Sequence, residues 1–193
     1  MQGYDIQRSG RVSELPCVVI LNSGTELPEQ EYENVTIVNN TEQLPTPAFF
    51  NNEIEKHPNS IIVCLDEYNA LYDGKGVQKI VDFFVKNNDI PCIIYTDTKM
   101  RIGGAGLVNH LPAFSQGGVM AGFGINQPIV FETFTHTIPS RPFNEQLDSM
   151  YFYDMFVKCA RSYILHHIPE TVFVSTSRQP SQQDISVLNE QSG

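Results

Sequence analysis

The chain has 193 residues, of which 41% are hydrophobic and 18% are charged, and its formal net charge is −10. This length suits one domain with a substantial core and is short for two. An acidic chain repels phosphate backbones, and the sequence has no run of lysine or arginine to offset that charge locally. The composition therefore argues against nucleic acid as a general partner.

No apolar run approaches the roughly 20 residues that cross a bilayer, and the polar N-terminal segment lacks the apolar stretch of a secretory signal. The four cysteines have neither CxxC nor Cys/His ligand spacing, and three of them lie in apolar, strand-like runs. We therefore expect a soluble protein with buried free thiols, made in a reducing compartment such as the cytoplasm or assembled into a particle there. The cysteines are Cys17, Cys64, Cys92 and Cys159.

Short apolar runs alternate with amphipathic segments in the first half of the chain. Val77, Ile80 and Phe84 recur at helical spacing, and Thr46 before Pro47 is typical of a capped helix start. Buried strands that alternate with such helices predict an α/β fold with a mostly parallel central sheet and helices on both faces. The predicted strands are residues 16–21, 35–38, 60–65 and 91–95.

The second half begins with a glycine-rich segment. Residues 101–127 contain seven glycines and predict a loop whose apolar residues hold it against the body. A strand is predicted at 129–131 and a last, short one at 172–174. Between them, the strongest helical pattern begins at Asp148 and ends near the pair His166–His167, where the helix dipole would favour a cation.

These patterns divide the chain into an N-terminal arm (1–14), an α/β domain (15–175) and a polar C-terminal tail (176–193). The tail has the composition of a disordered segment. Polar termini are rarely ordered unless something ties them down. We therefore expect both arms to pack on other protein chains in a larger assembly.

Five segments, taken in chain order, carry a likeness to a known family. The first strand ends in Asn22, the second runs into TIVNNT, and the third runs into LDEYN. The strand IPCIIYTD follows, and PFNEQL then precedes YDMFVK in the predicted helix. Together they resemble the inverting family 2 glycosyltransferases of the GT-A fold. The resemblance implies a single GT-A-like, Rossmann-like domain.

The resemblance also implies a set of site residues. Oxygen ligands suit Mg²⁺ or Mn²⁺, and such a cation neutralises the diphosphate leaving group of a nucleotide sugar. A carboxylate then acts as general base on the acceptor hydroxyl. Carried onto this sequence, the donor-binding positions are Asn22, Asn39, Asn40 and Asp66, the metal positions are Asp66 and Glu67, and the candidate bases are Asp148 and Asp154.

Several positions that need a carboxylate in that family carry other residues here. Asn39 stands at the base-binding position, and Tyr68 stands at the third position of the metal motif. Tyr151 and Phe152 stand where the general base belongs. Tyrosine cannot replace a carboxylate as a metal ligand at neutral pH. The loop after the first strand is also too short for the helix that shapes the nucleotide pocket.

Two functions therefore remain open. The first is a catalytically degenerate glycosyltransferase-like domain, without a cofactor, that serves as a structural or binding component of a larger assembly such as a virion. The second is an active, divergent glycosyltransferase that uses Mg²⁺ or Mn²⁺ and moves sugar from a nucleotide sugar to an acceptor hydroxyl. The lost carboxylates favour the first, and a nucleotide sugar or a glycan is the small-molecule partner that the resemblance suggests.

Overall fold

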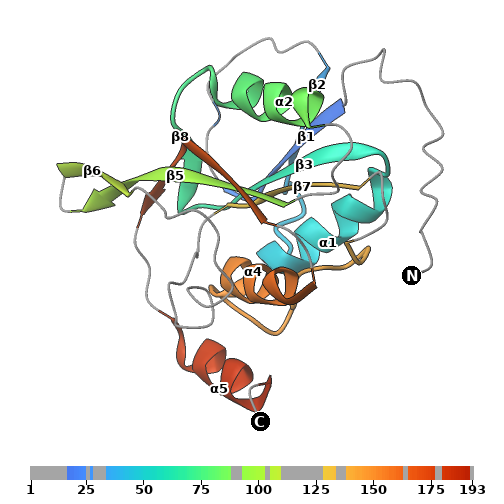
Figure 1. Ribbon diagram of the computed structural model, residues 1–193. Helices are drawn as coiled ribbons and strands as arrows, with labels where there is room; N and C mark the ends of the chain where they lie inside the picture. Colours follow the sequence, from blue (N-terminus) through green and yellow to red (C-terminus); the bar gives the residue numbers. More distant parts are fainter. Residues whose placement is uncertain are drawn as a thin grey trace, which may run out of the picture.

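The computed structural model describes residues 17–24, 27, 34–87, 93–102, 105–109, 128–133, 138–162, 165–176 and 180–191. In this part of the chain, eight strands form one sheet with helices against it (Figure 1). The strands are β1 (Cys17–Asn22), β2 (Val35–Asn39), β3 (Ser60–Leu65), β4 (Asn69–Leu71), β5 (Ile93–Ile102), β6 (Ala105–Asn109), β7 (Val130–Glu132) and β8 (Leu165–Thr176). The predicted N-terminal arm at 1–14 lies outside the described residues.

The sheet is mixed. Its order is β2-β1-β3-β7-β5-β8-β4, and β6 pairs with β5 off this path. β1 runs parallel to β2 and β3, and β5 runs parallel to β8, whereas β7 is antiparallel to both β3 and β5. β4 and β6 are also antiparallel to their partners. The prediction of a mostly parallel sheet is therefore wrong, because an apolar run indicates a buried strand without giving its direction.

Helices cover both faces of the sheet, as predicted. α1 (Thr46–Lys56) and α4 (Tyr151–Ser162) lie on one face, and α2 (Gly76–Lys86) lies on the other (Figure 1). Successive residues of a strand point to opposite faces. Val19 of β1 accordingly belongs to the core beneath α1 and α4, and its neighbour Ile20 belongs to the core beneath α2.

An aromatic cluster joins α1 to α4 on their shared face. The ring of Phe50 on α1 lies 5.3 Å from that of Phe143 and 6.0 Å from that of Phe152, between ring centroids. Tyr151 packs edge-on against Phe152 at 4.9 Å. Because buried aromatic rings contribute large apolar areas, this cluster fixes the start of α4 and with it the direction of the Tyr151 side chain.

Two predicted helix ends are wrong. Pro45, not Thr46, is the N-cap of α1, and the Thr46 hydroxyl bonds the loop after β1 instead. α4 ends at Ser162, and the pair His166–His167 lies in β8, where it is aligned with residues of β5. No helix C-terminus therefore lies at these histidines. The apolar positions of this segment satisfied a helical period, but pairing with β5 sets its conformation.

Part of the glycine-rich segment is β-structure. β6 pairs antiparallel with the far end of β5, from Thr98 opposite Asn109 to Ile102 opposite Ala105. The prediction of a loop is wrong for residues 101–102, which end β5, and for residues 105–109. The rest of the glycine-rich segment, at 103–104 and 110–127, lies outside the described residues.

The C-terminal tail contains a helix, α5 (Gln182–Gln191), that docks on its own chain. Ser181 and Asp184 form a capping box, in which the Ser181 hydroxyl accepts from the Asp184 backbone N–H at 3.0 Å and the Asp184 carboxylate accepts from the Ser181 N–H at 2.8 Å. The same carboxylate accepts backbone N–H bonds from Asp148 at 2.9 Å and Ser149 at 3.1 Å, just before α4. One buried carboxylate thus joins the starts of two helices.

The disorder-like composition of the tail therefore does not prevent a helix at residues 182–191. Asp184 is buried, and Val187 and Leu188 of α5 pack against the core beneath α4. The domain itself supplies these contacts. Packing of the arms on other chains stays a prediction.

Of the four cysteines, Cys64 and Cys159 are buried free thiols, as predicted. Burial raises the pKa of Cys64 well above its ordinary range and that of Cys159 to about 12. Both therefore remain protonated and behave as small apolar side chains. No helix in the described residues is long and apolar enough to cross a membrane.

Candidate functional site

The carboxyl ends of β1, β2 and β3 meet at one edge of the sheet. The chain leaves β1 toward β2 on one side, and β3 lies on the other side, which makes this edge a topological switch point. The Ser23 N–H donates to the Leu65 carbonyl at 2.8 Å, and the Asn40 N–H donates to the Asn22 carbonyl at 3.0 Å. Ligands bind at such edges in open α/β sheets, so this is the candidate site.

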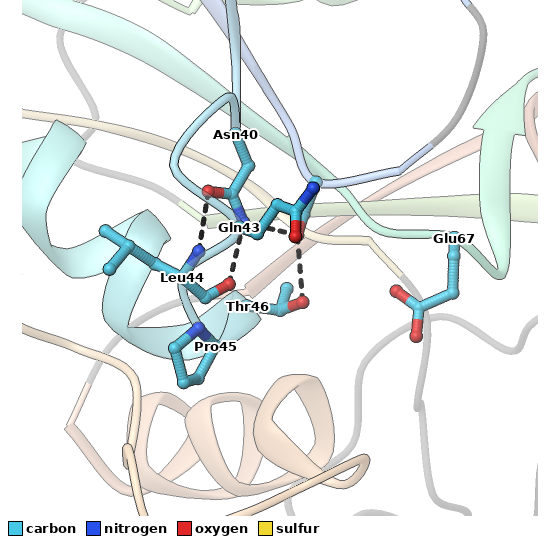
Figure 2. Close-up of a pocket in the computed structure, with 7 residues that line it drawn as sticks. Asn40, Gln43, Leu44, Pro45, Thr46 and Glu67 are labelled. Atoms are coloured by element: carbon cyan, nitrogen blue, oxygen red, sulfur yellow. Dashed lines mark hydrogen bonds between the residues drawn. The ribbon is translucent and has the colours of Figure 1, made fainter.

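An open pocket with a volume of ≈ 440 Å³ lies at this edge (Figure 2). Its walls come from the ends of all three strands and from the start of α1. Glu67, from the loop after β3, stands apart from the residues of the loop between β2 and α1. The lining residues are Ser23, Asn40, Gln43, Leu44, Pro45, Thr46 and Glu67.

The loop between β2 and α1 is held by its own side chains. The Asn40 amide donates to the Leu44 carbonyl at 2.7 Å and accepts from the Leu44 N–H at 3.0 Å (Figure 2). The hydroxyls of Ser23 and Thr46 share a hydrogen bond of 2.9 Å, which ties this loop to the end of β1. Such local bonds fix the loop as one wall of the pocket.

A glycine lets the opposite wall approach. A Cβ atom added at Gly24 would lie 3.0 Å from the Cβ of Glu67. Glycine has no Cβ, so the loop after β1 can rest directly on the loop after β3. Glu67 itself is exposed at the pocket.

The resemblance implies that three asparagines bind the nucleotide-sugar donor, and these three residues lie in different places. Asn40 lines the pocket. Asn22 is buried and donates its amide N–H to the Asn39 side-chain oxygen at 2.8 Å, while Asn39 is exposed beyond the pocket lining. The three residues thus share one sheet edge, but only Asn40 belongs to the pocket wall.

Asp66 is buried and does not line the pocket. Its exposed fraction is 0%, and its carboxylate accepts a hydrogen bond from the Tyr68 backbone N–H at 3.0 Å. It also accepts from the side-chain amide of Asn69 and from the hydroxyl of Tyr151 on α4. Asp66 and Glu67 are adjacent in sequence, yet one points into the protein and the other into the pocket. The structure does not bring the two predicted metal ligands together.

The buried network around Asp66 extends beyond the predicted site residues. Asn69 of β4 donates to Asp66 and accepts from the hydroxyl of Ser175 on β8. Asn69 and Ser175 are both buried. The network therefore joins β3, β4, β8 and α4 behind the pocket. Sequence reasoning gave neither Asn69 nor Ser175 a role, although Asn69 ends the segment LDEYN, because their pairing depends on the order of the sheet.

The two candidate bases lie away from the pocket lining. Asp154 on α4 is buried and forms an ion pair with Lys158 at 2.6 Å. Asp148 is exposed and accepts a hydrogen bond from the Ser181 hydroxyl at 3.1 Å. Both carboxylates therefore have structural partners. Among the described residues, no group of three or more His, Cys, Asp or Glu side chains is arranged to hold a metal ion.

A second polar cluster lies on β5 and β8. His167 Nε2 lies 2.8 Å from an Asp97 carboxylate oxygen, and the His167 ring stacks on Tyr95 with centroids 4.9 Å apart. Burial, with a further contribution from Asp97, raises the pKa of Tyr95 to about 12. Val130 of β7 pairs with both Val63 of β3 and Ile94 of β5. Asp66 and Asp97 each follow these partners by three residues, so the register places them at the same level of the sheet. Sequence reasoning missed this pair because it placed His167 in a helix.

No protein-family model matches the chain, and no curated protein sequence does.

Proposed function

We propose that this chain is a catalytically degenerate domain of the GT-A glycosyltransferase type that serves as a structural or binding component of a larger assembly, for which a virion is a natural setting. In this proposal it transfers no sugar and uses no metal ion. The pocket at the ends of β1, β2 and β3 is retained for binding.

The observation that carries the proposal is the hydrogen bond from Tyr151 to Asp66. The resemblance assigns Asp66 to a metal ion and the position of Tyr151 to the general base. In the structure, these two side chains bind each other inside the core. A metal ligand must offer a free lone pair to a cation at an accessible place. Asp66 offers its carboxylate to Tyr151, Asn69 and the Tyr68 backbone instead.

The arrangement of the sheet supports a GT-A-like origin. The parallel group β2-β1-β3 has its pocket at the carboxyl ends of the strands, as nucleotide-binding α/β sheets do. Helices cover both faces of this sheet. A fold of this type does not by itself carry an activity, so the state of Asp66 decides between binding and catalysis.

An active transferase is the second candidate, and one observation favours it. Glu67 is exposed at the pocket and is next in sequence to Asp66. A shift of the loop after β3 would bring the Asp66 carboxylate to the pocket beside that of Glu67. That enzyme would bind Mn²⁺ through Asp66 and Glu67. The two candidates therefore differ in their affinity for Mn²⁺.

The test is a titration of the full chain with Mn²⁺, followed by electron paramagnetic resonance, with and without UDP-glucose or GDP-mannose. We expect no saturable binding of Mn²⁺ at millimolar concentration. Because a bound ligand must stabilise the fold, the melting temperature should not rise. No UDP or GDP should be released from the nucleotide sugars. Saturable Mn²⁺ binding that is lost in both Asp66→Asn and Glu67→Gln would overturn the proposal. Glu42→Gln, an exposed carboxylate outside the pocket lining, is the matched control.

A further inference from the structure

We propose that the pocket between the β2–α1 loop and Glu67 binds a neutral sugar without a metal ion. This inference rests on the proposed function, since it names the ligand of the pocket that the degenerate domain retains. It differs from a nucleotide-sugar site in that the described lining residues include no lysine or arginine to hold a diphosphate.

The lining of the pocket combines apolar groups with hydrogen-bonding groups, as a sugar ring does. Leu44 and Pro45 supply an apolar surface on which the C–H face of a sugar can pack. Gln43 and Glu67 supply hydrogen-bonding groups beside it. The Gln43 amide both donates and accepts, and the Glu67 carboxylate accepts from neighbouring hydroxyls. A ligand with several hydroxyls on a C–H frame satisfies both surfaces at once.

The side chains available for binding are those that the loop does not use itself. Asn40, Ser23 and Thr46 are bonded to one another and to the backbone of Leu44. The side chains of Gln43 and Glu67 are exposed and make no hydrogen bond or ion pair with another described residue. A fixed wall with a few free polar groups lowers the entropic cost of binding.

The charge of the pocket argues against phosphate. Glu67 is the only charged residue that the described part of the chain contributes to the lining, and it is negative. The whole chain carries a net charge of −10, which adds to the repulsion of anions. A divalent cation could offset both, but the carboxylate of Asp66 is buried and already accepts hydrogen bonds. A neutral ligand avoids this repulsion.

A polyamine is the other ligand that a negative pocket attracts. Such a ligand needs several carboxylates or carbonyls around each ammonium group, because an ammonium group only donates hydrogen bonds. The described lining residues offer one carboxylate, and their remaining polar side chains are amides and hydroxyls that also donate. This balance of donors and acceptors matches hydroxyl groups better than ammonium groups.

The experiment is a ¹H–¹⁵N titration of the full chain with the methyl glycosides of glucose, galactose, mannose and N-acetylglucosamine, and separately with UDP and spermidine, all without metal. We expect at least one glycoside to shift the backbone amides of Ser23, Gln43 and Thr46 in a saturable manner. Gln43→Ala and Glu67→Gln should each weaken that affinity at least fivefold, whereas Glu42→Gln should leave it unchanged. All three positions are exposed, so their variants should fold.

The outcomes separate this inference from the proposed function. Absence of any glycoside shift, shifts confined to other residues, or tighter binding of UDP or spermidine at the same amides would each overturn the sugar-binding inference. None of these results bears on Asp66. The Mn²⁺ titration above tests the proposed function by itself, since a chain that binds neither Mn²⁺ nor sugar still satisfies it.

Discussion

A buried carboxylate is stable only when its oxygens accept hydrogen bonds, and Asp66 obtains such bonds from a backbone N–H, an amide and a phenol. The phenol comes from Tyr151, which the aromatic cluster of α1 and α4 holds in place. Packing and hydrogen bonding therefore act on the same side chain. This makes Tyr151 the residue at which the packing of the aromatic cluster and the hydrogen bonding of Asp66 are linked.

Tyr151→Phe should lower the free energy of unfolding by about 1–3 kcal/mol, because it keeps the ring and removes one donor to a buried carboxylate. Urea denaturation followed by circular dichroism measures this change. Tyr153→Phe removes the same hydroxyl two residues later on α4, where Tyr153 is only half-buried and has no hydrogen bond to another described residue. That control should stay within about 0.5 kcal/mol of the native chain. Equal losses in the two variants would contradict the role of the Tyr151 hydroxyl.

Asp184 links two elements, since its carboxylate accepts from the N–H groups that precede α4 and from the start of its own helix α5. Negative charge is favourable at the positive end of a helix dipole, and here it lies at two such ends. Burial alone would raise the pKa of Asp184, but hydrogen bonds from Ser149 and Ser181 outweigh it and lower the pKa to about 2.

Asp184→Asn should release α5 and lower the free energy of unfolding by about 1–3 kcal/mol, because the amide cannot accept all of these bonds and carries no charge. Hydrogen exchange should show lost protection at the amides of Ser149 and Met150, which face the carboxylate. Glu190→Gln removes the same charge from an exposed position of α5 and should change neither quantity. Unchanged exchange in Asp184→Asn would show that the helix is held by its apolar contacts alone.

The pH dependence of the tail follows from the same pKa. The folded value of about 2 lies below the ordinary value of 3.8, so the charged carboxylate favours the folded chain. Its contribution is complete above about pH 4 and is lost as the pH falls toward 2. The difference in stability between the native chain and Asp184→Asn should therefore shrink over this interval.

The strands of the first half could be predicted from the sequence, whereas the tail helix could not. β1 and β3 are continuous apolar runs, β2 is an apolar run interrupted by Thr36, and polar residues follow each of them, so this local signal is sufficient. The motif SQQD at 181–184 is a capping box. The residues around it are polar and few of them can be buried, so the local sequence favours disorder over a helix. The helix depends on the N–H groups before α4, which lie far away in sequence.

The candidate site was predictable in its location and not in its details. Asn22, Asn39 and Asp66 end three strands, so a shared sheet edge follows once the strands are parallel neighbours. The burial of Asp66 depends on Tyr151, and its partner Asn69 depends on pairing of β4 with β8. Such contacts between distant segments leave no local pattern in the sequence.

β7 is the strand that joins the two parallel groups into one sheet. It is short, and it pairs antiparallel with β3 on one side and with β5 on the other. Phe131, fully buried, is aligned with Ile62 of β3 and Ile93 of β5. The core on the side of α1 and α4 thus crosses from one group to the other through this residue.

Phe131→Ala should therefore lower the free energy of unfolding by about 3–5 kcal/mol, the cost of a large cavity in a buried core. Denaturation followed by both circular dichroism and tyrosine fluorescence should still give one coincident transition, because the two groups share the core. Val85→Ala shortens an exposed side chain of α2 and should change the stability by less than about 0.5 kcal/mol. Two separate transitions in the native chain would contradict the single cooperative sheet.

The pairing of β5 with β8 also sets a condition on how the chain folds. Residue 93 pairs with residue 165, and the whole chain from β6 to α4 lies between these two residues in the sequence. Closing so long a loop costs entropy before any contact of this pair is gained. We therefore expect the β5–β8 pair to form late in folding, so that a newly made chain exposes the facing edges of these two strands until they pair.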